Sequence, residues 1–233
     1  MNIRVEEIWK RFYCREKKII ALCGISLSIP SGDFVAIVGE SGSGKTTLLN
    51  VMCGMEKPDS GRVYLGDEEI TRMTDDEQAR KRRSDIGVIY QFYNLVPELS
   101  VGDNVTLPRE LDGRAVEEER LRAALDSVGL SGRGGDFPDM LSGGQQQRAA
   151  IARAIYQEPS VILADEPTGN LDEKCADEIV GLLKRINKER GTTVIVVTHS
   201  GRVAEVADRV ITVKDGAIVS DVRNKKKYGA SEL

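Results

Sequence analysis

The 233-residue sequence lacks any long hydrophobic run, and this absence limits where the protein is expected to reside. Charged residues make up 30% of the chain. No stretch approaches the roughly 18 consecutive apolar residues of a membrane-spanning helix. The first residues, Met1 to Glu7, are typical of a charged strand and not of a secretory signal peptide. We therefore expect a cytosolic protein that folds as one domain around one sizeable core.

Histidine and cysteine are also scarce, which argues against a metal centre or a disulfide framework. The chain has 1 histidine and 4 cysteines, with no C-x-x-C pair among Cys14, Cys23, Cys53 and Cys175. Zinc sites and disulfide scaffolds need clustered ligands or paired cysteines, so the cysteines are expected to be reduced. The net charge of −4 argues against a broad nucleic-acid-binding surface, which would be basic.

The most informative stretch is a glycine-rich turn between a predicted strand and a predicted helix. The apolar run Phe34–Val38 is typical of a buried strand, and residues 46–53 read as a helix that stops at Gly54. Glycines allow consecutive backbone N–H groups to point at one place, and the helix N-terminus adds partial positive charge. The pattern G-x-x-x-x-G-K-[ST] in this context predicts a nucleotide phosphate-binding loop made of Gly39, Glu40, Ser41, Gly42, Ser43, Gly44, Lys45, Thr46 and Thr47.

Two side chains of this loop have separate predicted roles. Lys45 is expected to reach the terminal phosphates of the nucleotide, and the Thr46 hydroxyl is expected to be a ligand of the magnesium ion that bridges them. The alternative is a glycine-rich turn with an incidental lysine. That alternative leaves the complete pattern and its strand-to-helix context unexplained.

Two adjacent carboxylates, Asp165 and Glu166, stand at the C-terminal end of the predicted strand 161–166. Open α/β sheets bind their ligands at the carboxyl ends of strands, and two carboxylates at a buried strand end are costly without a partner. A magnesium ion would supply one partner. We therefore predict that Asp165 is a direct or outer-sphere partner of the metal and that Glu166 orients and deprotonates an attacking water. The alternative is a strand that runs out into a charged loop.

Two more polar residues follow predicted strands, Gln91 after 86–90 and His199 after 192–197. A polar residue at a strand end is often only a loop residue, and a lone histidine is more often structural than catalytic. Their place at strand ends assigns both to the ligand edge of the sheet.

The segments before and between these strands have simpler patterns. Residues 3–29 alternate as antiparallel strands, with Phe12 and Tyr13 as aromatic residues in a charged stretch where either is a candidate to stack on an adenine base. Residues 100–129 have a helical pattern that is interrupted at Pro108 and Gly113 and predicts a small helical subdomain.

A second glycine-rich helix start follows this subdomain. Ser142, Gly143 and Gly144 precede an alanine-rich helix that runs to about Tyr156, so the same physics predicts a second potential anion site. Further along, Asp172 is expected to cap a helix with a buried apolar stripe. A strand pair and a basic tail, residues 223–227, end the chain.

Taken together, these motifs resemble the ATP-binding subunit of an ABC transporter over essentially the whole chain. The motifs follow the family's order and spacing: the phosphate loop, Gln91, the signature Leu141-Ser142-Gly143-Gly144-Gln145, the strand that ends in Asp165 and Glu166, Asp172, and His199. The resemblance implies an α/β P-loop NTPase (RecA-like) core with an N-terminal antiparallel β subdomain. It also implies a single ATP-binding domain over residues 1–233, with an inserted helical subdomain at about 92–158.

The resemblance further implies a head-to-tail dimer that holds two ATP molecules and Mg²⁺ between its subunits. Each ATP would lie on Lys45 and Thr46 of one subunit and under the signature residues of the other. The family assigns Gln91 to magnesium and water contact and to coupling with a membrane partner, and His199 to the γ-phosphate. It also assigns further ATP contacts, which fall here on Ser142, Gly143, Gly144, Gln145, on Asp172 across the dimer, and on Phe12 with Tyr13 adjacent.

Three segments suggest a finer resemblance, to the branch that includes lipoprotein-release, macrolide-export, antimicrobial-peptide-resistance and cell-division subunits. They are Gln91–Pro97, Leu141–Arg148 and Glu166–Asp172. This branch implies a separately encoded or fused membrane permease, a peripheral place on the inner face of the cell membrane, and export of a lipophilic or peptide-like substrate. A non-transport ABC ATPase and a P-loop kinase or passive nucleotide-binding module remain the alternatives.

Overall fold

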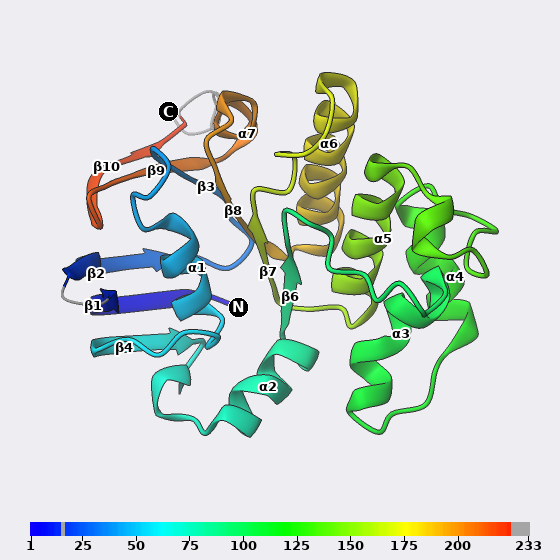
Figure 1. Cartoon of the computed structure of the whole chain (residues 1–233), viewed down its shortest axis with the longest axis horizontal. Helices are drawn as coiled ribbons and strands as arrows, with labels where there is room; N and C mark the ends of the chain where they lie inside the picture. The colour runs from blue at the N-terminus through cyan, green and yellow to red at the C-terminus, as the bar shows by residue number, and fades with distance from the viewer. Residues whose placement is uncertain (15–16, 225–233) are drawn as a thin grey trace, which may run out of the picture.

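A mixed β-sheet forms the centre of the molecule. The computed structural model describes residues 1–14 and 17–224. The sheet has the strand order β10-β9-β3-β8-β7-β6 (Figure 1). β3 pairs in parallel with β8 and β9, β7 pairs in parallel with β6 and β8, and β10 is antiparallel to β9. The strand bounds are β3 Phe34–Val38, β6 Ile86–Ile89, β7 Val161–Asp165, β8 Thr193–Thr198, β9 Arg209–Lys214 and β10 Ala217–Arg223.

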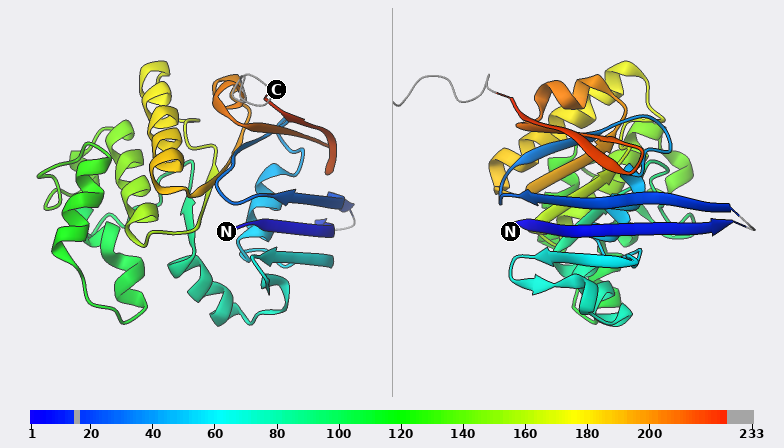
Figure 2. Two further views of the ribbon diagram at one scale, coloured as in Figure 1. Left: turned by 180° about the vertical axis from the view of Figure 1, so that it is seen from behind. Right: turned by 90° about the vertical axis from the view of Figure 1, so that its left-hand side faces the viewer.

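A second, antiparallel sheet has the order β2-β1-β4-β5. Its first two strands form a long hairpin that projects beyond the rest of the molecule (Figure 2). The predicted antiparallel sheet at the front of the chain is therefore confirmed. The strand bounds are β1 Ile3–Cys14, β2 Lys17–Ile29, β4 Ser60–Leu65 and β5 Glu68–Glu69, which the short 3₁₀ helix η1 Ile70–Arg72 follows.

The two faces of the mixed sheet pack into two separate hydrophobic cores, because alternate residues of a strand point to opposite faces. On one face, Val35 and Ile37 of β3 pack with the antiparallel sheet and helix α1, Lys45–Met52. On the other face, Phe34 and Ala36 pack with helices α3 (Val101–Leu111), α5 (Gly143–Tyr156) and α6 (Glu173–Arg190). Burial on both faces explains why these strands read as continuous apolar runs and not as alternating ones.

Helices cover the side of the mixed sheet that lies away from the antiparallel sheet (Figure 1). α5 packs against α3, α4 and β6, and α6 packs against α5 and β8. The position of α3, α4 and α5 agrees with the predicted helical insertion, whose limits near residues 92 and 158 stay a prediction. The helix bounds are α2 Asp75–Ser84, α3 Val101–Leu111, α4 Glu118–Ser127, η2 Pro138–Met140, α5 Gly143–Tyr156, α6 Glu173–Arg190 and α7 Gly201–Val206.

Two details of the helices differ from the sequence-based expectation. The predicted interruption at Pro108 is wrong, because α3 continues through Pro108 to Leu111. A proline removes one backbone donor, and here only three residues follow it, so the helix ends within one turn of that defect. The helix α7 was not predicted, because its six residues are too few to show a helical period.

The predicted helix cap at Asp172 is confirmed. Thr74 and Glu77 form a reciprocal capping box at the start of α2, and the Asp172 carboxylate accepts a hydrogen bond from the backbone N–H of Cys175 at the start of α6. No helix in the described part of the chain has the length and apolar character needed to cross a membrane. Residues 225–227 of the basic tail lie outside the described residues.

Truncation of the α6 core contact should strongly destabilise the fold. Leu183 is 0% exposed in the core between α6 and the sheet. Leu183→Ala should therefore lower the free energy of unfolding by about 2–5 kcal/mol, through lost transfer energy and the cavity left behind. Urea unfolding followed by circular dichroism measures this loss. The matched control is Leu111→Ala, because Leu111 is 66% exposed and should cost less than about 0.5 kcal/mol. Equal losses for the two variants would contradict the assigned core.

Candidate nucleotide-binding site

Parallel pairing brings residues that are far apart in the sequence to one edge of the mixed sheet. β8 lies between β3 and β7, with Val38 opposite Thr198 and Asp165 opposite Val197. The loop after β3, the two carboxylates at the end of β7 and the Thr198-His199 pair at the end of β8 are therefore neighbours. This is the edge at which open α/β sheets bind ligands.

The loop between β3 and α1 is wedged between two backbone carbonyls. A Cβ atom at Gly39 would lie 2.2 Å from the carbonyl oxygen of Val213 in β9, and one at Gly44 would lie 2.3 Å from that of Ala21 in β2. Gly44 also has a φ of +101°, which disfavours any residue with a side chain. Glycine is thus required at both positions by close approach, and the loop is built into the fold rather than free.

The β9–β10 turn holds the same loop from a third direction. The backbone N–H of Gly216 donates to the carbonyl of Ser43 at 3.0 Å, and the carbonyl of Gly216 accepts from Cys23 at 2.8 Å. Ser43 itself is 6% exposed. The loop therefore has a fixed shape that is set by β2, β9 and the turn at Gly216.

Lys45 and Thr46 connect this loop to its own backbone and to β7. Lys45 is buried, and its Nζ donates to the carbonyls of Gly39 and Glu40, each at 2.8 Å, so the ammonium lies along the loop. The Thr46 hydroxyl donates to Oδ1 of Asp165 at 3.0 Å. Burial raises the pKa of Asp165, and the hydrogen bond from Thr46 opposes that rise.

The Thr46 hydroxyl and the Asp165 carboxylate fit a magnesium ion. Magnesium prefers oxygen ligands and is usually bound through one or two carboxylates together with substrate phosphates, not in an all-protein cage. Across residues 1–14 and 17–224 no group of three or more His, Cys, Asp or Glu is placed to hold a metal. The adjacent hydroxyl and carboxylate oxygens match the first arrangement and not the second.

The Glu166 carboxylate is held in place by the end of β8. Its Oε2 accepts from the Thr198 hydroxyl at 3.0 Å, and its Oε1 lies 2.8 Å from Nδ1 of His199. Glu166 has a φ of +46°, an uncommon conformation for a residue with a side chain, and its side chain is 14% exposed. An oriented carboxylate at this edge of the sheet is able to accept a proton from water.

Gln91 lies beside the loop that follows Glu166. The Asn170 side-chain amide donates to the Gln91 carbonyl at 3.1 Å, and Nε2 of Gln91 lies 3.5 Å from Oδ1 of Asn170. A Cβ atom at Gly169 would lie 3.0 Å from Nε2 of Gln91. The structure therefore brings Gln91 to the same edge as Glu166, through the 166–172 loop.

The signature segment Ser142–Gln145 lies away from the phosphate loop of the same chain. α5, which it opens, and α1, which follows the phosphate loop, lie on opposite sides of β7 and β8 in Figure 1. Ser142 caps α5, because its hydroxyl accepts from the Gln145 N–H at 3.4 Å and its own N–H donates to the Gln145 side chain at 3.0 Å. Gly144 packs against Cys175 at the start of α6, where the backbone N–H of Cys175 lowers the pKa of Asp172.

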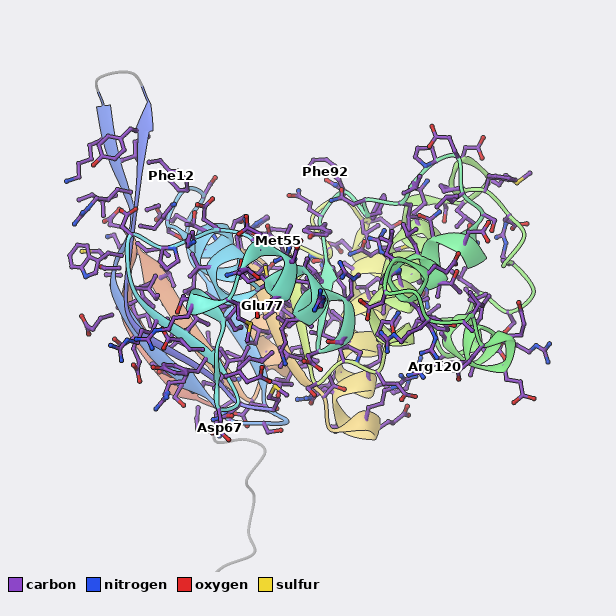
Figure 3. All side chains as sticks on the ribbon, turned by 90° about the horizontal axis from the view of Figure 1, so that it is seen from below. Phe12, Met55, Asp67, Glu77, Phe92 and Arg120 are labelled. Carbon is purple, nitrogen blue, oxygen red and sulfur yellow. The ribbon has the colours of Figure 1, made fainter. Side chains whose placement is uncertain are left out.

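Phe12 lies on the projecting β1–β2 hairpin (Figure 3). It is 38% exposed, and the Nζ of Lys10 lies 5.1 Å from the centre of its ring, whereas Tyr13 is 74% exposed. An exposed ring is available for stacking, and the choice between Phe12 and Tyr13 stays a prediction.

Cys23, Cys53 and Cys175 are free cysteines, and burial raises the pKa of Cys53 to about 11.

Sequence analysis missed two residues that support the site. The Thr198 hydroxyl donates to Glu166. Its position at the end of a predicted strand is a signal that could have assigned Thr198 to the ligand edge of the sheet. Gln147 is fully buried in α5, and its side-chain amide donates to the carbonyl of Pro167 at 2.8 Å, next to Glu166. Nothing in the run Gln145–Gln147 distinguishes the residue that faces Pro167 from its neighbours.

Comparison with known proteins identifies the family. The family model described as "ABC transporter" matches residues 22–169. The chain is 44% identical over 230 residues to a macrolide export ATP-binding/permease protein MacB of Burkholderia thailandensis. The matched region covers 98% of this chain but 35% of the MacB protein. The chain thus spans about a third of the length of such relatives. It is 42% identical over 205 residues to an uncharacterized ABC transporter ATP-binding protein of Mycobacterium tuberculosis, covering 87% of this chain and 83% of that protein.

A solved structure has the same fold. The ATP-binding cassette MJ0796, in a dimeric post-hydrolysis state bound to ADP and Pi, superposes with a TM-score of 0.88 at 39% identity and covers 95% of this chain and 98% of that one. The expected α/β fold with an antiparallel β part and helical parts is confirmed.

Removal of the Asp165 charge should stabilise the fold and weaken the metal site. Burial raises the pKa of Asp165, so the ionised form costs folding free energy above that pKa, and the cost disappears at acid pH. Asp165→Asn should therefore unfold at a higher temperature than the parent near neutral pH, with a difference that shrinks as the pH falls. Magnesium-dependent nucleotide binding should be lost at the same time.

Thermal unfolding at several pH values, with and without MgATP, tests both effects. Asp67→Asn is the control, because Asp67 is exposed in the turn between β4 and β5 (Figure 3). A lower unfolding temperature for Asp165→Asn near neutral pH would contradict the assigned burial cost.

Proposed function

The chain belongs to the ABC transporter family as an ATP-binding, ATPase domain, and from this premise we propose that it hydrolyses ATP to drive a membrane permease. The observation that carries the proposal is the Glu166 carboxylate, fixed by Thr198 and His199 at the same sheet edge as Lys45 and Thr46. The site thus combines a phosphate cradle, an oxygen pair for a metal and an oriented base. Phosphoryl transfer to water requires these three parts.

Each residue has a defined part in this proposal. The N–H groups of the Gly39–Thr47 loop and the Lys45 ammonium bind the phosphates, and Thr46 and Asp165 would hold Mg²⁺, which when bound would neutralise charge on the phosphate oxygens. Glu166 accepts a proton from the attacking water as the new oxygen–phosphorus bond forms. The bond between the β-phosphate oxygen and the γ-phosphorus breaks, ADP and inorganic phosphate leave, and Glu166 releases its proton to the solvent. His199 holds Glu166 and would contact the γ-phosphate, and Gln91 would contact the metal and the attacking water.

The position of the signature segment supports a composite site. Ser142, Gly143 and Gly144 open a helix whose N-terminus attracts anions, yet that N-terminus lies on the other side of β7 and β8 from Lys45. Two chains placed head to tail bring each helix start to the other chain's phosphate loop. In the proposed homodimer, Ser142–Gln145 and Asp172 of one chain complete the ATP site of the other.

A membrane permease is the proposed partner. The MacB relatives are named as ATP-binding/permease proteins, and this chain matches about a third of their length. We place the domain at the inner face of the cell membrane, bound to a permease that exports a lipophilic or peptide-like substrate. A cavity of about 270 Å³ lined by Tyr90, Asn94, Leu107 and Leu111, next to Gln91, offers the permease a partly apolar docking surface. Leu111 on its rim is 66% exposed.

Glu166→Gln should preserve ATP binding and slow hydrolysis by about 100-fold or more, because an amide cannot act as a base. ATP would then persist between the subunits, so the dimer should accumulate with MgATP. Phosphate release and light scattering measure the two effects. Glu189→Gln is the control, because Glu189 is an exposed glutamate near the end of α6. Hydrolysis by Glu166→Gln at the parent rate would mean that Glu166 is not the base.

Lys45→Ala should instead weaken nucleotide binding itself. The variant loses a charged donor to the phosphates, and a hydrogen bond to a charged group contributes about 1.5–3 kcal/mol, so affinity should fall by at least about tenfold. Titration with a fluorescent ATP analogue measures this loss. Lys188→Ala, on the exposed last turn of α6, should bind as the parent does. Unchanged affinity in Lys45→Ala would exclude the proposed phosphate-binding role.

A further inference from the structure

Two consecutive residues after β6 adopt a strained backbone conformation. Tyr93 has a φ of +62° and Asn94 a φ of +50°, and neither is glycine. L-residues rarely occupy this left-handed region, and such conformations persist only where surrounding contacts hold them. The strained pair begins two residues after Gln91, so the contacts that hold it also determine the path of the Gln91 loop.

Arg153 of α5 supplies those contacts. Its guanidinium donates to the carbonyl of Asn94 at 2.5 Å and to the carbonyl of Tyr93 at 2.7 Å. Burial lowers the pKa of Arg153. A desolvated arginine is costly unless its donors are well satisfied. Here two backbone carbonyls in a strained loop satisfy them.

The Tyr93 side chain returns to the start of the same helix. A Cβ atom at Gly143 would lie 2.9 Å from the Tyr93 hydroxyl oxygen, so the tyrosine packs directly against the first residue of α5. Arg153 lies ten residues further along α5, a rise of about 15 Å at the usual 1.5 Å per residue. The loop is thus attached to α5 at Arg153 and reaches Gly143 through Tyr93.

We propose that Arg153 and Tyr93 are positioning residues of the composite ATP site. Arg153 holds the left-handed Tyr93-Asn94 pair, and Tyr93 then sets the direction in which Ser142 and Gly143 face the partner chain's nucleotide. The same clamp fixes the loop that carries Gln91 in this chain's own site. This inference rests on the proposed head-to-tail dimer, and it deepens that proposal by naming the residues that aim the signature segment.

Gln146 of α5 donates to the carbonyls of Pro138 and Leu141 just before Ser142, whereas the contacts of Gln147 and Arg148 lie further along the helix. Gln147 donates to the carbonyl of Pro167, and Arg148 donates to the carbonyl of Val128 and pairs with Glu178 of α6. These contacts anchor the body of the helix to its own subunit. Tyr93 is the residue of the Gln91 loop that touches Gly143.

The test measures ATP-driven dimerisation in the Glu166→Gln background. Arg153→Met removes the guanidinium at similar length, Tyr93→Ala removes the packed ring, and Arg153→Lys keeps one charged donor. Arg153→Met and Tyr93→Ala should raise the dimer dissociation constant by at least about tenfold, equivalent to about 1.4 kcal/mol. Arg153→Lys should give an intermediate value. Affinity of the dilute, monomeric variants for a fluorescent ATP analogue should fall by less than the dimer affinity does, because Lys45 and the rest of the Gly39–Thr47 loop are untouched.

Arg148→Met is the matched control, because Arg148 lies on the same helix but contacts neither Tyr93 nor Asn94. It should leave the dimer dissociation constant unchanged. If Arg153→Met fails to fold by circular dichroism, Tyr93→Ala decides, because Tyr93 lies in a partly exposed loop. Dimerisation of Tyr93→Ala at the parent level would overturn the inference. Failure of Glu166→Gln alone to dimerise with MgATP would instead overturn the proposed dimer.

Discussion

The parallel register of β3, β8 and β7 is the constraint on which the rest of the site depends. Because Val38 lies opposite Thr198 and Asp165 lies opposite Val197, the three strand ends stop at the same level. Two hydrogen bonds between side chains exist only in this register, from Thr46 to Asp165 and from Thr198 to Glu166. The side chains on the two faces of these strands pack into two separate hydrophobic cores. A shift of one residue would reverse every inward side chain and separate both pairs.

Helix α5 is the second organising element. It begins at the signature segment and carries the buried Gln147, which bonds the loop after Glu166, and Arg153, which bonds the loop after Gln91. A rigid helix keeps these attachment points at fixed spacing. In the proposed dimer, the helix that completes one ATP site is therefore joined to the residues that act in the other. Coupling between the two sites then needs no more than the movement of one helix.

Much of this architecture was predictable because it rests on local patterns. The β3 strand, the glycine-rich turn that follows it and the cap at Asp172 depend on residues that are neighbours in the sequence, and the structure has all three where they were predicted. The contacts of Arg153 and Gln147 were not predictable, because a helical arginine or glutamine is ordinarily exposed and the carbonyls they meet come from distant loops. The path of α3 through Pro108 was not predicted, because proline is ordinarily a local signal that a helix is interrupted. Here α3 continues for three residues beyond Pro108 before it ends.

The turn at Gly216 has a consequence for how the protein is made. The phosphate loop is complete in sequence by Thr47, but its shape depends on backbone contacts with Val213 and Gly216, near the end of the described chain. A ribosome synthesises the polypeptide from the N-terminus at about 5–20 residues per second, so some 170 residues separate the loop from its support. The nascent chain therefore emerges with a phosphate loop that still lacks its contacts with Val213 and Gly216. The loop acquires its full set of contacts only after β9 and β10 have been synthesised and have added to the sheet, about 8–34 seconds after the loop itself.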